Sequence, residues 1–140
     1  MVKDCAEKIW KQRFSCYGRS GQNQHGIDVI SEDGCIVIQC KDHLKNDKES
    51  QNRFLREINR DYIKASSHFP AVRRFVVAAA LDRDASLQDA LLNWKEERNV
   101  TEEIIKKEIL FWDDICEIIT QYSELLKKYY PRNHGEWEIS

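Results

Sequence analysis

The sequence has few residues that interrupt regular structure and no long apolar run. Only two prolines are present, and no stretch approaches the roughly 18 consecutive apolar residues of a membrane-spanning helix. No apolar signal segment follows Met1 to Cys5, so we expect a cytoplasmic protein with no membrane partner. The chain of 140 residues is 41% apolar and long enough for one domain over residues 1–130, with a C-terminal tail at 131–140.

Cysteine pairs at metal-binding or redox spacing are also missing. The cysteines are Cys5, Cys16, Cys35, Cys40 and Cys116, an odd number with no Cys-x-x-Cys pair among them. This spacing supports neither a disulfide framework nor a structural zinc site. We therefore expect reduced, mostly buried thiols.

The sequence lacks an excess of basic charge, because its formal net charge is −2. The charge is nevertheless uneven: residues 1–75 contain 14 Lys and Arg against 10 Asp and Glu, and residues 76–140 contain 8 against 14. Clustered cations bind nucleic-acid phosphates, so a DNA surface is expected on the first half. Chance asymmetry in a charge-rich surface is an equal alternative.

Hydrophobic periodicity predicts four helices and four strands. The helices are expected over residues 3–14, between Lys48 and Phe69, from Ser86 to Trp94, and from Ile115 to Tyr129. The strands are expected at Ile27–Ile30, Cys35–Lys41, Arg74–Ala80 and Glu108–Phe111, with a hairpin turn at residues 32–34. The order α-β-β-α-β-α-β-α is typical of an α/β fold with a mixed central sheet flanked by helices on both faces.

The polar, glycine-rich segment at residues 18–26 is predicted to be a loop. Its side chains suited to hydrogen-bonding a DNA backbone are Arg19, Ser20, Gln22, Gln24 and His25. The alternatives are glycines that only close a tight turn and a histidine without a special role. The basic face formed by Arg53, Arg56, Arg60 and Lys64 is better explained as solvated, since glutamates are interleaved with it.

The side chains that suggest chemistry lie on the predicted hairpin. Gln39 and Lys41 are two residues apart on one strand and therefore share a face. If the strands pair, Asp28 meets them near the end of the hairpin. A carboxylate, an amide oxygen and the Cys40 main-chain carbonyl then converge, which suits Mg²⁺ or Mn²⁺. On spacing alone, three solvated polar residues are the more common explanation.

The longer strings make the pattern specific. Residues 18–30 read G-R-S-G-Q-x-Q-x-G-I-D-V-I, and residues 36–41 read I-V-I-Q-C-K. Together they resemble the PD-(D/E)xK nuclease superfamily, in particular the Mrr-like restriction endonucleases and related nuclease domains of antiphage defence proteins. Residues 74–87 and 109–119 also resemble later strand-helix units of that family.

The resemblance implies a restriction-endonuclease-like fold and a metal-dependent DNA endonuclease. It assigns catalytic and metal-binding roles to Asp28 and Gln39, and a catalytic role to Lys41. The family usually adds a glutamate from its first helix, for which Glu7 is the available residue; a surface glutamate is an equal alternative. Cleavage of both strands of double-stranded DNA further implies a homodimer or higher oligomer, or a place in a larger defence protein.

Two other functions stay open at this point. One is a catalytically silent module that binds DNA or assembles on the same fold. The other is an RNA-cleaving relative, because no base-reading element is visible in the sequence.

Overall fold

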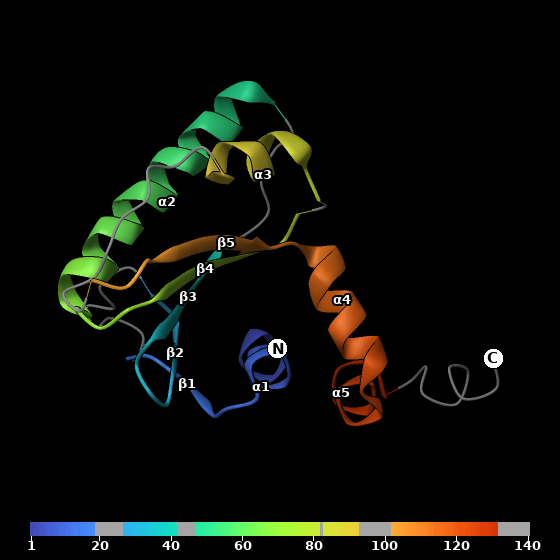
Figure 1. Ribbon diagram of the computed structural model, residues 1–140. Coiled ribbons are helices and arrows are strands. Elements are labelled where there is room, and N and C mark those ends of the chain that lie inside the picture. Colours follow the sequence, from blue (N-terminus) through green and yellow to red (C-terminus); the bar gives the residue numbers. More distant parts are fainter. Residues whose placement is uncertain (19–26, 42–46, 82, 93–101, 132–140) are drawn as a thin grey trace.

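The computed structural model describes residues 1–18, 27–41, 47–81, 83–92 and 102–131. In this part of the chain it contains five strands and five helices (Figure 1). The strands are β1 (Phe14–Cys16), β2 (Val29–Ser31), β3 (Ile36–Lys41), β4 (Arg74–Ala79) and β5 (Lys106–Leu110). The helices are α1 (Val2–Trp10), α2 (Lys48–His68), α3 (Ala85–Leu92), α4 (Trp112–Gln121) and α5 (Ser123–Tyr129).

The strands form one mixed sheet in the order β1-β2-β3-β4-β5. The pairs β1–β2 and β2–β3 are antiparallel, whereas β3–β4 and β4–β5 are parallel. The expected α/β class with a mixed sheet is confirmed. Because β2 runs against its neighbours, its start lies at the edge of the sheet where β3, β4 and β5 end. We call this the carboxyl edge, and the opposite end the amino edge.

The predicted order of elements is wrong in two places. The first helix was expected to continue to Phe14, but it ends at Lys11, which adopts a left-handed conformation with φ 54°. Phe14 then enters β1, where it is buried. The last helix was expected to be continuous, but the extended backbone of Tyr122 divides it into α4 and α5. The apolar spacing was read correctly, but it does not record these backbone breaks.

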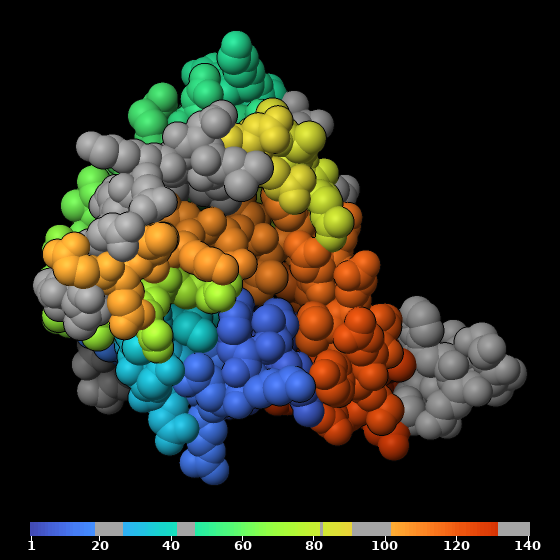
Figure 2. Space-filling view, viewed as in Figure 1, coloured from blue at the N-terminus to red at the C-terminus, as the bar shows by residue number. Residues whose placement is uncertain are grey.

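Helices cover both faces of the sheet, as expected (Figure 1). On the face covered by α2 and α3, side chains from alternate strand positions form one core, which includes Val37, Phe54, Ile58, Phe75, Val77 and Leu87. The other face packs against α1, α4 and α5 through a second core, which includes Ala6, Ile38, Val76, Ile115 and Leu126. Figure 2 shows α1 in blue beside the orange and red helices α4 and α5. The strand alternation therefore assigns each β3 side chain to one face.

Asp47 caps the long helix α2. Its Oδ1 accepts a hydrogen bond from the Ser50 backbone N–H at 2.8 Å, and its Oδ2 accepts one from the Ser50 hydroxyl at 3.0 Å. Such a cap satisfies one of the amide groups that have no partner within the helix. We expect Asp47→Ala to lower the free energy of unfolding by about 1 kcal/mol. Urea unfolding measures this, with Asn at position 47 as the control that keeps the cap; an equal loss for both variants would contradict it.

The cysteines are free, as expected, but the prediction that most are buried is wrong. Cys5 is buried, Cys16 is exposed, and the other three are half-buried. Burial raises the pKa of the Cys5 thiol to about 11, which keeps it protonated and unreactive at neutral pH. Within the described ranges, no helix is both long enough and apolar enough to cross a membrane.

Candidate active site

Asp28 lies at the point where the hairpin of β2 and β3 opens. The residue was expected inside a strand, but it directly precedes β2. Its backbone is held from both sides: its N–H donates to the Ile38 carbonyl at 2.8 Å, and its carbonyl accepts from the Tyr17 N–H at 2.7 Å. Asp28 is thus fixed between β3 and the residue after β1.

The Asp28 side chain makes a hydrogen bond to β3 beyond the point where the regular backbone pairing of β2 and β3 ends. The register pairs Val29 with Ile38, so a regular hairpin would set Asp28 opposite Gln39. The Asp28 N–H bonds instead to Ile38, one position out of register. The Cys40 N–H then donates a hydrogen bond to Asp28 Oδ2 at 2.8 Å. An irregular step of this kind re-aims a side chain, and here it anchors the carboxylate at the carboxyl edge.

Cys40 contacts this carboxylate, and the Gln39 side chain contacts Cys40. The Gln39 side-chain amide donates from Nε2 to the Cys40 carbonyl oxygen at 3.4 Å. The Cys40 residue therefore contacts Asp28 through its N–H and Gln39 through its carbonyl. Asp28, Cys40 and Gln39 are thus linked by two hydrogen bonds through Cys40, and the amide meets the carbonyl through its nitrogen.

Lys41 lies on the α2 side of the sheet, where two acidic side chains meet it. Lys41 Nζ is 2.6 Å from Asp61 Oδ2 and 3.9 Å from Glu57 Oε2. Glu57 and Asp61 are one helical turn apart on α2, so both reach the same strand residue. We call Lys41, Glu57 and Asp61 the Lys41 cluster.

The Lys41–Asp61 pair is largely enclosed. The Lys41 side chain is 18% exposed and that of Asp61 is 15% exposed. The Asp61 Oδ2 atom is buried without a hydrogen bond in the described part of the chain, so its contact with Lys41 is an ion pair without hydrogen-bond alignment. In such surroundings each charge depends on the other, because a lone buried charge is strongly disfavoured.

Sequence analysis did not identify Glu57 and Asp61 as site residues. Glu57 is one of the glutamates interleaved with the basic face of the same helix, and it was expected to pair with that face. That face is indeed exposed: Arg53, Arg56, Arg60 and Lys64 all lie in solvent. The signal that was available is the pair of acidic residues four apart beside the buried Ile58 and Tyr62, which marks them as near the core.

Glu7 is not brought to Asp28. Its Oε2 accepts a hydrogen bond from the Phe14 N–H at 3.0 Å, which closes the connection from α1 to β1. Phe14 pairs with Ser31, three residues along β2 from Asp28. At about 3.4 Å per residue this separates the two positions by roughly 10 Å. Glu7 therefore has a structural role in the connection from α1 to β1, and its position does not support the predicted role as a metal ligand.

The predicted DNA contacts cannot be placed in this geometry. Arg19, Ser20, Gln22, Gln24 and His25 lie outside the described residues. Both described ends of their segment, Gly18 and Ile27, adjoin Tyr17 and Asp28, which are hydrogen-bonded to each other. Gly18 and Ile27, the described residues on either side of the segment, therefore lie beside the carboxyl edge.

Among the described side chains assigned to this site, acidic groups outnumber basic ones. Asp28, Glu57 and Asp61 carry three formal negative charges, and Lys41 carries one positive charge. No cluster of three or more His, Cys, Asp or Glu with metal-binding geometry occurs among the described residues. The group around Cys40 has a different composition: the Asp28 carboxylate, the Cys40 carbonyl and the Gln39 amide, whose oxygen would face a cation only after the amide turns. That donor set fits a hard cation that keeps several of its waters, as Mg²⁺ does.

Comparisons of the chain with protein-family models, with curated proteins and with solved structures give no match. The resemblance to the PD-(D/E)xK superfamily therefore stays a prediction that depends on the residues themselves.

Proposed function

We propose that this chain is a metal-dependent endonuclease of the PD-(D/E)xK type, with a restriction-endonuclease-like fold, that hydrolyses double-stranded DNA in restriction or antiphage defence. The observation that carries the proposal is the contact of Asp28 with the Cys40 amide, beside Gln39 and on the strand of Lys41. The biological setting rests on the resemblance of residues 18–30 and 36–41 alone.

The proposed metal ligands are Asp28 Oδ atoms, the Gln39 amide oxygen and the Cys40 carbonyl. A bound Mg²⁺ or Mn²⁺ would supply positive charge to the phosphate and lower the pKa of a coordinated water. The hydrogen bond from Cys40 keeps the Asp28 carboxylate oriented without any movement of the strand. The Gln39 amide must turn its oxygen toward the cation, which requires only rotation about its terminal torsion.

Lys41 is proposed to orient the attacking water and to offset charge that develops on the phosphate. In the hydrolysis, the water oxygen bonds to phosphorus, the bond from phosphorus to the leaving oxygen breaks, and that oxygen gains a proton. Asp61 and Glu57 would hold the Lys41 ammonium at a fixed position beside the strand end. A long, flexible lysine gains precision from such partners.

The test is incubation of supercoiled plasmid DNA with the protein in Mg²⁺, in Mn²⁺ or in excess chelator. We expect nicked and linear products with either cation and none with chelator, because the Asp28 carboxylate and a phosphate are both anions and need a cation between them. Lys41→Ala is the matched inactive variant. Cleavage that persists in chelator would overturn the proposal.

A second candidate is a catalytically silent DNA-binding module on the same fold. It is favoured by the position of Glu7, which bonds to Phe14 and is not near Asp28. Asp28 is then the one carboxylate among the predicted metal ligands, and a single carboxylate binds a cation weakly. This candidate predicts that the protein shifts DNA in a gel without nicking it in any divalent cation. RNA of the same sequence, offered in parallel, distinguishes an RNA-cleaving relative.

A further inference from the structure

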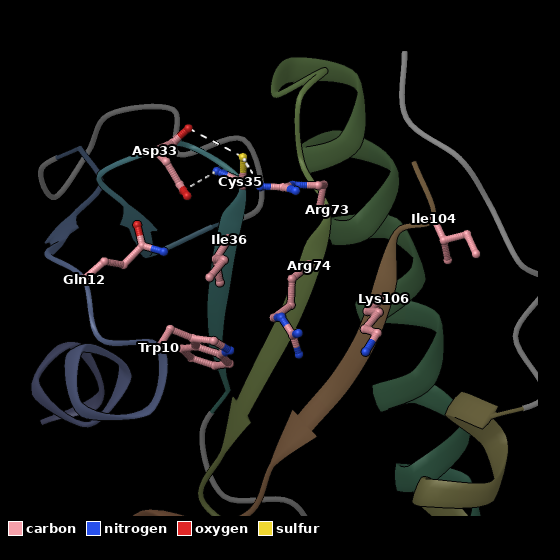
Figure 3. Close-up of a pocket in the computed structure, with 9 residues that line it drawn as sticks. All are labelled: Trp10, Gln12, Asp33, Cys35, Ile36, Arg73, Arg74, Ile104 and Lys106. Carbon is pink, nitrogen blue, oxygen red and sulfur yellow. Dashed lines mark hydrogen bonds between the residues drawn. The ribbon is translucent and has the colours of Figure 1, made fainter. Parts of the chain in front are cut away.

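A second site is suggested by a pocket at the amino edge, at the other end of β3 from Gln39 and Lys41. Its volume is about 310 Å³. Three of its side chains are neighbours across the sheet, because Ile36 of β3 pairs with Arg74 of β4, and Arg74 pairs with Lys106 of β5. Figure 3 shows these three in a row on adjacent strands, with Trp10 from the end of α1 beside them. The centre of the pocket is therefore built on the sheet.

The pocket is rich in cations. Arg73, Arg74 and Lys106 line it, against Asp33 as the lining acid. Arg73 is paired with Glu103, and Arg74 is paired with Glu108. Lys106 lies in the same row, and it has no ion pair with any acidic residue in the described ranges. The Lys106 ammonium and the remaining donors of the Arg74 guanidinium can both donate to an anionic group placed between them.

The acid in the wall, Asp33, is oriented toward the hairpin turn by the hydrogen bonds that its carboxylate accepts. Asp33 Oδ1 accepts hydrogen bonds from the Ser31 hydroxyl at 2.7 Å and from the Cys35 N–H at 3.0 Å. These bonds from Ser31 and Cys35 hold the pKa of Asp33 below its usual range. Asp33 thus fixes the hairpin turn, and Lys106 is the lining cation without an ion pair in the described ranges.

The Trp10 indole contributes an aromatic part of the wall. The Trp10 ring lies 5.7 Å from the Arg74 guanidinium carbon, in a cation–π contact, and its other neighbour is Phe14 at 5.8 Å. Ile104 adds a 47% exposed apolar side chain on the β5 side. An indole beside clustered cations suits a ligand that combines a planar ring with an anion.

We propose that this pocket binds a nucleoside monophosphate, with its phosphate between Arg74 and Lys106 and its base against Trp10. The volume lies at the lower end of the range for small-molecule pockets, as expected for a ligand of this size. The site is separate from Asp28 and Lys41, so the inference does not depend on the proposed nuclease activity.

The test is a titration of the full chain with each of the four common nucleoside monophosphates, followed by tryptophan fluorescence and thermal unfolding. Adenosine and inorganic phosphate are titrated separately. We expect saturable binding of at least one monophosphate, with a higher unfolding temperature, and at least tenfold weaker binding of the nucleoside and of phosphate, because each lacks one half of the contacts. Equal binding of monophosphate and phosphate would overturn the base contact, and no saturable binding would overturn the site.

Two variants separate this site from non-specific attraction. Lys106→Ala removes an exposed cation and is expected to weaken monophosphate binding about tenfold, the usual effect of losing one charge-assisted hydrogen bond. Lys107→Ala changes the charge equally, but Lys107 lies over the Tyr62 ring on the opposite face, so its affinity should match the parent protein. Equal loss in both variants would overturn the proposed phosphate position. Trp10→Leu should abolish the preference for monophosphate over phosphate.

Discussion

Lys41→Ala is expected to lower plasmid cleavage about 10²- to 10⁴-fold, the range for removal of a positioned group that assists proton transfer. Lys41 is the basic side chain next to the predicted metal ligands, and Glu57 and Asp61 hold it there. The measurement is the initial rate of supercoiled plasmid loss in Mg²⁺ at equal protein concentration. A rate within tenfold of the parent protein would contradict the proposed role of Lys41.

The loss of Lys41 also has a structural effect that must be separated from catalysis. It leaves the buried Asp61 Oδ2 without its compensating charge, and we expect a cost in unfolding free energy of up to about 3 kcal/mol. The double variant Lys41→Ala, Asp61→Asn removes both charges and should regain much of that stability. Its cleavage should remain as low as that of the single variant. Recovery of cleavage together with stability would show that Lys41 acts only through the fold.

The single variant Asp61→Asn is the positioning control. It keeps the Lys41 ammonium and the side-chain shape but removes the charge that holds the ammonium. We expect a smaller reduction of cleavage, about 10- to 100-fold, as for other residues that orient a catalytic group. A matched change of an exposed acid on the same helix, Glu49→Gln, should leave cleavage unchanged, since Glu49 contacts only Arg53 at 3.9 Å among the described ion pairs.

Phe75→Ala is expected to lower the free energy of unfolding by about 3 to 5 kcal/mol, the cost of removing a fully buried ring. Phe75 is 1% exposed in β4, the strand paired on both sides in parallel. Its ring packs edge-on against Tyr62 of α2, with 5.4 Å between centroids and 76° between planes. Because small domains are stable by only about 5 to 15 kcal/mol, this variant loses a large fraction of its stability.

Urea unfolding of the parent protein, Phe75→Ala and Ile63→Ala measures this effect. Ile63 lies on α2 one residue after Tyr62 but is 55% exposed, so its replacement should change stability by no more than about 0.5 kcal/mol. Comparable midpoints for Phe75→Ala and Ile63→Ala would contradict the packing of β4 against α2. A large loss in Phe75→Ala alone would support it.

The sequence by itself determined the fold class and most elements. Three elements can be recognised from neighbouring residues alone. They are the β-branched run at residues 36–41, the apolar strand at 74–79, and the helix with its apolar stripe through Phe54, Ile58 and Tyr62. Local periodicity is enough to assign an element and its buried face. It also placed Gln39 and Lys41 on one face, since alternation along a strand depends on nothing distant.

Only the tertiary structure decided what surrounds Lys41 and where Glu7 lies. Glu57 and Asp61 reach Lys41 because α2 returns over the sheet before β4. A contact between such distant segments produces no recognisable pattern of residue spacing in the sequence. Glu7 was placed by the turn at Lys11, whose left-handed backbone directs the chain into β1. The partners of side chains on different elements depend on packing and on single backbone angles, and a local sequence pattern predicts neither.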